Sequence, residues 1–251
     1  MHDFVDLSYY RILQDGLPGD MTIRRFVHGV AWTAAVLSDG STGVAMHTSG
    51  ETVPRMFESL VGLPLHAAGE ALLSWNMEEA SEAFAAVNAF YNRADNGFTL
   101  KETKTLDDID MRGRNVGMIG MMLGHSNMTR ESFRDARNLY IMDREEKQGA
   151  LPDSACEFFL PLCDLVIMTG SAAINKTLPR LLELSKNARV ILTGPSVSCC
   201  PALLRIGIDR LHGRVITQPE PMLEAILEKR ISVNAFSVPC MVDSISQGFS
   251  K

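Results

Sequence analysis

The spacing of apolar residues changes midway along the chain, and the first hundred residues combine strand-like and helical patterns. Residues 1–20 have helical spacing, and Gly16 with the Leu-Pro-Gly that follows predicts where the helix ends. Two β-rich runs come next, at residues 25–37 and 42–48, with Asp39 and Gly40 between them. Asp-Gly between two such runs predicts a hairpin.

Two helices are predicted after the hairpin, at residues 66–74 and 78–93, because apolar residues recur there at intervals of three and four. Asn76, with Glu79 three residues later, is typical of a helix start. Strands followed by helices indicate an α+β domain. We place this domain at residues 1–100.

The second part of the chain alternates short apolar strands with amphipathic helices. A charged segment at residues 95–114, which we interpret as a linker, precedes this alternation. Strands are predicted at residues 115–121, 137–142, 164–169, 188–193 and 214–217, and helices at 178–186 and 220–229. Such alternation predicts a parallel sheet covered on both faces. We therefore expect an α/β protein, with a Rossmann-like parallel-sheet domain at residues 101–251 after the smaller α+β domain.

Composition narrows the classes of function. The 251 residues carry 24 Lys and Arg against 30 Asp and Glu, a formal charge of −6, which argues against a nucleic-acid partner. No uncharged stretch is long enough for a membrane span, and the first residues do not have the order of a signal peptide. Five cysteines, an odd number, favour free thiols in a reducing cytoplasm. A homodimer is the general expectation for assembly.

Ligands of open parallel sheets bind beyond the carboxyl ends of the strands, so the residues after each predicted strand are the candidates for a binding site. The strand that ends at Thr169 and Gly170 leads to Asn175 and Thr177, at the start of the next helix. Their hydroxyl and amide groups, with the free backbone N–H groups of a helix start, are typical of an anion site. Helix capping is the alternative interpretation of Asn175 and Thr177.

The following strand ends in Gly194, Pro195 and Ser196, which predict a tight turn that exposes a hydroxyl group. Cys199 and Cys200 come shortly after this turn. Two adjacent cysteines are a poor pair of metal ligands, and no Cys-x-x-Cys motif accompanies them.

Two other strand ends offer an acid and a histidine. Asp143 follows the second strand, where many Rossmann folds bind a ribose hydroxyl, although the charges beside it also fit a solvated loop. His125 follows the first strand and could exchange a proton near neutral pH. The glycines of that strand end are spaced G-x-x-G-x-x-x-G, so the dinucleotide fingerprint is absent.

The first domain contributes two candidates. His47 follows the second β-rich run, and Asn88 lies at the edge of the apolar face of its helix. His47 and His125 are the candidates for a general base by residue type. Asn88 is either a ligand contact or a structural hydrogen-bonding residue. The sequence contains no Ser-His-Asp order, nucleophile elbow, Walker loop or kinase signature.

The order of these motifs resembles the putative heavy-metal chelation family. Its pattern is a strand ending in Thr-Gly, then Asn-x-Thr-Leu at residues 175–178, a Leu-rich helix, Gly-Pro-Ser after the next strand, and a strand that contains Gly213. Residues 26–46 resemble the first hairpin of the family, and residues 78–92 resemble its helix. The resemblance covers nearly the whole chain, and the order and spacing of the motifs carry it.

The resemblance implies an enolase-N-terminal-like first domain that closes over the Rossmann-like sheet, with a ligand pocket between the two. It implies a role in heavy-metal chelation and metal homeostasis, in which a flavin-, pterin- or siderophore-like chelator is condensed or hydrolysed. We expect a small polar or anionic ligand. The residues expected to hold it are Thr169, Gly170, Asn175, Thr177, Gly194, Pro195 and Ser196, with Asn88 and His47 from the first domain.

Two other classes of function stay open at this point. A direct metal-binding protein without chemistry would use Cys199, Cys200 and a histidine. A nucleotide-binding Rossmann protein would use Asp143 for a ribose. The cofactor, and whether the protein is an enzyme, remain unassigned.

Overall fold

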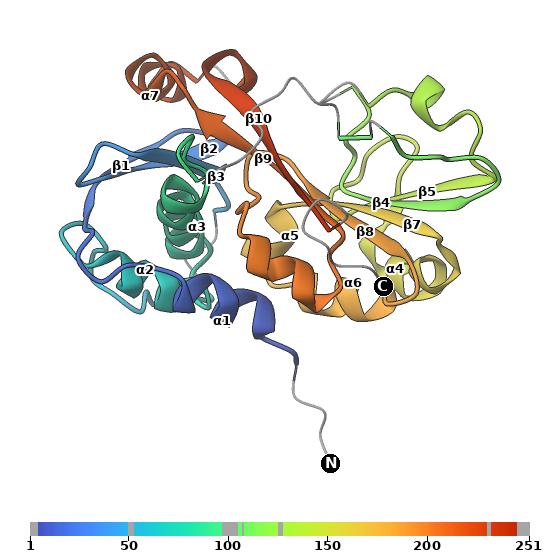
Figure 1. Ribbon diagram of the computed structural model, residues 1–251, viewed down its shortest axis with the longest axis horizontal. Coiled ribbons are helices and arrows are strands. Elements are labelled where there is room, and N and C mark those ends of the chain that lie inside the picture. Colours follow the sequence, from blue (N-terminus) through green and yellow to red (C-terminus); the bar gives the residue numbers. More distant parts are fainter. Residues whose placement is uncertain are drawn as a thin grey trace.

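The computed structural model describes residues 5–49, 53–96, 105–106, 108–124, 128–229 and 232–244 of the 251-residue chain. A three-stranded antiparallel sheet is followed along the chain by a seven-stranded, mostly parallel sheet (Figure 1). The fold is therefore mixed α/β, with the Rossmann-like sheet in the second part, as the sequence predicted. Within the described ranges, no helix has the length and hydropathy needed to cross a membrane.

The small sheet is a meander of β1 (Ile23–His28), β2 (Trp32–Leu37) and β3 (Thr42–Met46). The single β-rich run predicted at residues 25–37 is thus two strands, because the chain reverses at residues 29–31. Gly29 suits this reversal, since a Cβ atom there would lie 2.7 Å from the Ile226 side chain. The predicted Asp-Gly turn joins β2 to β3, with Gly40 at a φ of +86°.

The two faces of the small sheet pack against different helices, because successive side chains of a strand point to opposite faces. Ala35, Leu37 and Ala45 belong to the core that contains α3 (Met77–Tyr91), which is capped by Asn76 as predicted. Ala34, Val36 and Val44 instead belong to a core with Met222, Leu223 and Ile226 of α7 (Pro219–Leu227). A helix near the end of the chain therefore covers the outer face of the first sheet.

Two further helices, α1 (Ser8–Asp15) and α2 (Leu65–Ala71), complete the first part of the molecule. Tyr10 of α1 donates a hydrogen bond to the carbonyl oxygen of Ala173 at 2.9 Å, which ties the first part to the second. The boundary predicted at residue 100 falls within residues 97–104, outside the described residues. It stays a prediction.

The large sheet has the strand order β10-β9-β8-β7-β4-β5-β6. All neighbours are parallel except β9 and β10. The strands are β4 (Asn115–Ile119), β5 (Asn138–Asp143), β6 (Leu151–Pro152), β7 (Leu165–Thr169), β8 (Arg189–Thr193), β9 (Arg210–Ile216) and β10 (Ser237–Asp243).

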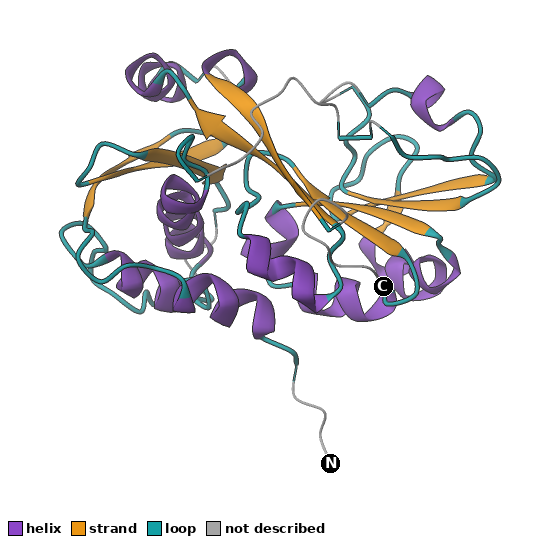
Figure 2. Ribbon diagram, viewed as in Figure 1, coloured by secondary structure: helices purple, strands orange, loops and turns teal. Residues whose placement is uncertain are grey.

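Both faces of this sheet are covered, but in different ways (Figure 2). Helices α4 (Cys156–Phe159), α5 (Ser171–Ile174) and α6 (Leu178–Leu184) lie on one face. On the other face, irregular segments and the short 3₁₀ turn Arg130–Phe133 supply the apolar cover, which includes Met111 and Met128. The helix predicted at residues 220–229 is α7, and it packs on the small sheet.

Candidate functional site

The strand order of the large sheet reverses between β4 and β7. The chain moves from β4 to β5 and β6 on one side, and then returns to β7, β8 and β9 on the other. In open parallel sheets, ligands bind beyond the carboxyl ends of the strands at such a reversal. A cavity of about 600 Å³ lies there, which is a typical size for a small-molecule site. Gly120, Asp143 and Thr169, at the ends of β4, β5 and β7, all line it.

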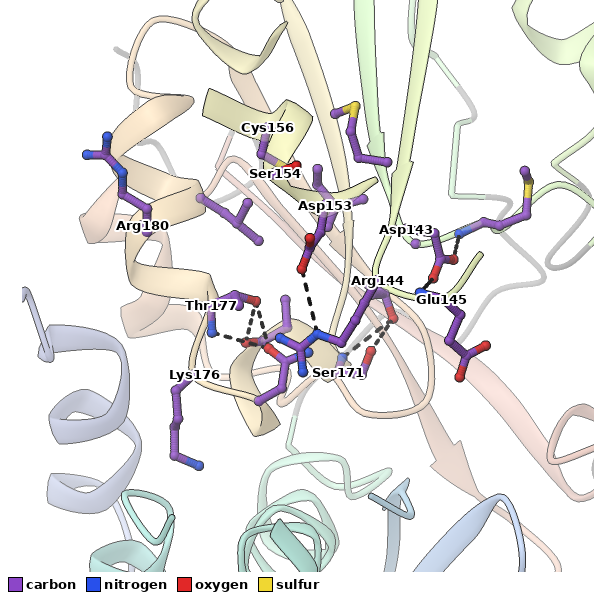
Figure 3. Close-up of a pocket in the computed structure, with 18 of the residues that line it drawn as sticks. Asp143, Arg144, Glu145, Asp153, Ser154, Cys156, Ser171, Lys176, Thr177 and Arg180 are labelled. Atoms are coloured by element: carbon purple, nitrogen blue, oxygen red, sulfur yellow. Dashed lines mark hydrogen bonds and ion pairs between the residues drawn. The ribbon is translucent and has the colours of Figure 1, made fainter. Parts of the chain in front are cut away.

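Hydroxyl and amide groups gather on the β7 side of this cavity (Figure 3). Thr169 Oγ1 lies 3.1 Å from Ser171 Oγ. Asn175 Oδ1 accepts hydrogen bonds from Thr177 Oγ1 at 2.7 Å and from the Thr177 backbone N–H at 3.2 Å. This contact holds the Asn175 side chain in place, and its Nδ2 has no hydrogen-bond partner among the described residues. A ligand acceptor could take that amide hydrogen.

Asp143 fixes the β5 side of the cavity. Its carboxylate accepts hydrogen bonds from the backbone N–H of Met121 at 2.7 Å and of Glu145 at 2.9 Å, and from Lys147 Nζ at 3.0 Å. Burial opposes the charge, but these donors outweigh it and hold the pKa of Asp143 below its usual value. The ionised carboxylate therefore holds the loops after β4 and β5 together. Because it already accepts three hydrogen bonds, it has fewer free acceptor positions for a ribose hydroxyl.

Most of the cations around the cavity already have carboxylate partners. Arg144 lies 3.8 Å from Asp153, Lys147 contacts Asp143, and Arg180 contacts Glu157 at 2.6 Å. Lys176 differs, because it has no carboxylate partner among the described residues.

Lys176 lies between Asn175 and Thr177 with a left-handed backbone, at a φ of +66°. Its Nζ donates to the carbonyl oxygen of Ile174 at 2.8 Å and lies 5.9 Å from the centre of the Tyr10 ring of α1. Figure 3 shows the side chain extending away from Arg144. Burial lowers the pKa of Lys176 to about 8. An anionic ligand would offset that desolvation through charge attraction and keep the ammonium charged.

The structure brings together four of the predicted site residues. Asp143, Thr169, Asn175 and Thr177 line the cavity. The Thr-Gly and Gly-Pro-Ser corners do lie at the same edge of the sheet, because Thr169 of β7 pairs with Thr193 of β8. The second corner nevertheless has a different environment from the first.

Gly194, Pro195 and Ser196 do not line this cavity, which differs from the expectation. Ser196 Oγ accepts a hydrogen bond from the Met46 backbone N–H of β3 at 2.9 Å, so this corner contacts the first part of the molecule. Gly170 also has a packing role, because a Cβ atom there would lie 2.8 Å from backbone atoms of Ser196 and Val197. Ser196 therefore joins the two parts of the molecule, whereas Gly170 packs within the second part.

Asn88 belongs to the same junction and is 1% exposed. Its Nδ2 donates to the Val44 carbonyl oxygen at 2.8 Å, and its Oδ1 accepts from Ser198 Oγ at 2.5 Å. Asn92, one turn later at the C-cap of α3, donates to the Val197 carbonyl oxygen and accepts from the Cys199 backbone N–H. Of the two interpretations of Asn88, the structure therefore supports the structural one.

Of the two histidines predicted as general bases, His47 is the one that lies within the described residues. His47 Nδ1 is 3.0 Å from Thr33 Oγ1, and the cavity is lined by its neighbours Met46 and Thr48 rather than by His47 itself. His125 lies outside the described residues.

The adjacent cysteines do not form a metal pair with a histidine in the described part of the chain. Cys199 Sγ faces Cys240 Sγ at 3.1 Å, while Cys200 lies beside Tyr91. Burial raises the pKa of both thiols, so both stay protonated near neutral pH. The thiolate, and not the thiol, is the form that binds a metal ion.

Sequence reasoning missed several residues of the cavity wall. Lys176 stands between two predicted site residues, and this position could have identified it. Its left-handed backbone conformation, in contrast, could not be predicted from the sequence. Met46 and Thr48 come from the other sheet, and only the packing of the two parts brings them to this edge.

Comparison with known proteins gives two family matches. Residues 106–237 match a family described as "Putative heavy-metal chelation" (DUF364), and residues 10–91 match a second family with the same description. Among curated proteins, an uncharacterized protein of Methanocaldococcus jannaschii is 29% identical over 160 residues. The match covers 60% of this chain and 60% of that relative.

Two solved structures share the fold. A DUF364 protein of unknown function from Desulfitobacterium hafniense is 28% identical, with a TM-score of 0.82 over 94% of this chain and 97% of that one. A second, from Pyrococcus horikoshii, is 21% identical, with a TM-score of 0.75 over 93% and 97% of the two chains. At that lower identity, the second match supports the fold alone.

Proposed function

The chain belongs to the family described as putative heavy-metal chelation, and from this premise we propose that it binds a small anionic chelator in the cavity at the ends of β4, β5 and β7. The observation that carries the proposal is the lining of that cavity. Thr169, Ser171, Asn175 and Thr177 offer hydroxyl and amide groups, and Lys176 offers a cation without a carboxylate partner among the described residues. Chelators combine acidic oxygens with polar rings or amides, and this lining complements them.

The ligand class that we propose is a flavin-, pterin- or siderophore-like molecule. Apolar cavity residues support a flat or partly apolar ligand, because Met46, Ile119, Met121, Met122 and Met142 lie among the polar groups. Methionine side chains adapt to rings of different shape. The family description names heavy-metal chelation, and metal homeostasis through such a chelator is the role that we propose.

A reaction on the bound chelator, by condensation or hydrolysis, is the finer part of the proposal. Lys176 is the cavity residue whose chemistry suits it, because an ammonium beside the bound chelator could donate a proton to it. Asn175 Nδ2 would orient the ligand, since its Oδ1 is already held by Thr177.

A ligand screen tests the binding proposal. The unfolding temperature of the full chain is measured with panels of nucleotides, flavins, pterins and siderophore-like chelators. A ligand at 100 times its Kd stabilises the folded state by about 2.7 kcal/mol. We expect that ligands of the flavin, pterin or siderophore panels stabilise the chain. If nucleotides alone stabilise it, the proposed chelator is wrong and the ligand is a nucleotide.

Substitutions then locate the binding site. Asn175→Ala and Lys176→Met should each abolish most of the stabilisation by the ligand found, while the proteins remain folded. Asn138→Ala is the matched control, because Asn138 is exposed at the start of β5, the opposite end from the cavity. Unchanged affinity in both cavity variants would contradict this placement of the site.

A further inference from the structure

His28, Glu78 and Glu82 form a second group of polar side chains, apart from the cavity. His28 ends β1, and the two glutamates lie one turn apart at the start of α3. Each of the three side chains brings one potential ligand atom within 4.8 Å of the other two. Among the residues that the structure describes, it is the one group of three His, Cys, Asp or Glu side chains with this property.

We propose that His28, Glu78 and Glu82 bind one divalent first-row transition-metal ion. One imidazole with two carboxylates is a donor set suited to Zn²⁺, Mn²⁺, Co²⁺ or Ni²⁺. The absence of a thiolate from this donor set makes it a poor match for a soft ion such as Cu⁺. The proposal does not depend on the ligand of the cavity.

The two closest contacts of His28 run from different ring nitrogens to different glutamates. His28 Nε2 lies 3.3 Å from Glu82 Oε1, and His28 Nδ1 lies 3.5 Å from Glu78 Oε1. Charge-assisted hydrogen bonds between such groups are shorter, about 2.7–2.9 Å. Two donors that bind zinc at about 2.0–2.2 Å in a tetrahedral arrangement lie roughly 3.4 Å apart, so one ion held through one ring nitrogen would draw the three ligand atoms closer than the 4.8 Å within which they now lie. One ring nitrogen would bind the ion, and the other would be left to donate a hydrogen bond, as metal-bound histidines do.

A supporting set of contacts orients the carboxylate of Glu82. The Arg55 guanidinium bonds to Glu82 Oε2, which leaves Oε1 directed at His28. The segment that carries Arg55 is itself held to α3, because the buried Glu79 accepts from the backbone N–H groups of Met56 at 2.8 Å and Phe57 at 2.9 Å. Metal-binding carboxylates are commonly oriented by such outer contacts.

The group is also open to solvent on one side. The side chains of His28 and Glu78 are 35% and 26% exposed, whereas that of Glu82 is 8% exposed. Three protein ligands with an accessible side leave coordination positions for water or for a chelating molecule. His47 lies beside the group, with its ring centre 6.2 Å from that of His28, and its neighbours Met46 and Thr48 line the cavity.

Metal titration of the full chain tests this site. Untagged, chelator-treated protein is titrated with Zn²⁺ by calorimetry and with Co²⁺ by visible absorption, where the band intensity reports the coordination. We expect saturable binding of one ion per chain. His28→Gln and Glu78→Gln should each weaken it by about tenfold or more. These two positions are chosen because both are partly exposed, so that the variants fold.

His66→Gln and Glu70→Gln are the matched controls, because both residues are exposed on α2. They should bind Zn²⁺ and Co²⁺ as the unmodified chain does. The proposal is overturned if the chain binds no Zn²⁺ or Co²⁺, or if the His28 and Glu78 variants, with unchanged circular dichroism, keep the original affinity.

Discussion

Replacing Gly170 with alanine tests whether the corner after β7 is a packing position or a ligand contact. The added Cβ would lie 2.8 Å from the Ser196 carbonyl carbon, the Val197 backbone nitrogen and a Val197 side-chain atom. Ordinary contacts at such atoms are about 3.5–4.0 Å, so the two corners must separate by several tenths of an ångström or more.

The expected cost follows from that overlap. Overpacking of a well-packed region costs about 1–3 kcal/mol, and here two of the three crowded atoms are backbone atoms that cannot rotate away. For a chain of this length, about 1 kcal/mol corresponds to a 2–4 °C change of the unfolding temperature. Gly170→Ala should therefore lower the unfolding temperature by ~2–12 °C, with a parallel decrease of the urea midpoint.

Gly19→Ala provides the control for this experiment. Gly19 is exposed, and no atom lies within 4 Å of a Cβ built there. Alanine at such a position leaves stability unchanged or raises it by up to about 1 kcal/mol, because the unfolded chain loses freedom. If Gly170→Ala unfolds at the same temperature as Gly19→Ala, the packing interpretation of the corner is wrong.

Two other substitutions test the contacts that organise the site. Asp143→Asn should destabilise the fold by about 1–3 kcal/mol at pH 7, because it removes the charge of a buried carboxylate that accepts three hydrogen bonds. The lowered pKa of Asp143 stabilises the folded state above the unfolded carboxyl pKa of about 4, and this contribution disappears as the pH falls below that value. The difference in urea midpoint between variant and parent should therefore become smaller from pH 5 to pH 3. A difference that becomes larger would contradict the lowered pKa of Asp143. Tyr10→Phe should cost about 0.5–1.5 kcal/mol, because it removes the hydrogen bond to Ala173, and an unchanged urea midpoint would show that this tie contributes nothing.

The elements that the sequence predicted well are those with a strong local pattern. Strands β7 and β8 lie within one residue of the predicted ranges, because each is an unbroken apolar run. The helix α3 begins at the predicted cap, where Asn76 accepts from the Glu79 backbone. Local signals of this kind do not depend on what packs against the element.

Strand β10 was not predicted, and β9 is longer than expected, because their pairing depends on contacts between distant parts of the chain. Pro239 in the middle of β10 argues against a central strand, but β10 lies at the edge of the sheet, where proline is tolerated. Its antiparallel partner, β9, lies about 20 residues earlier, beyond α7. Pairing over such a distance is a property of the folded chain and has no local signal.

The candidate site shows the same division. The rule for strand ends found Thr169 and Asn175, because it depends only on the alternation of strands and helices. It also selected Ser196, which lies at the same edge but contacts Met46 of the small sheet. Which strand ends stay accessible is decided by the packing of the first part on the second.

The packing of α7 on the small sheet has a consequence for synthesis of the chain. Strands β1 to β3 leave the ribosome early, while α7, which covers Ala34, Val36 and Val44, emerges about 170 residues later. At a synthesis rate of ~5–20 residues per second, roughly 10–35 seconds separate the emergence of this apolar face from that of α7. The outer face of the small sheet therefore stays without its native cover until residues 219–227 have been synthesised.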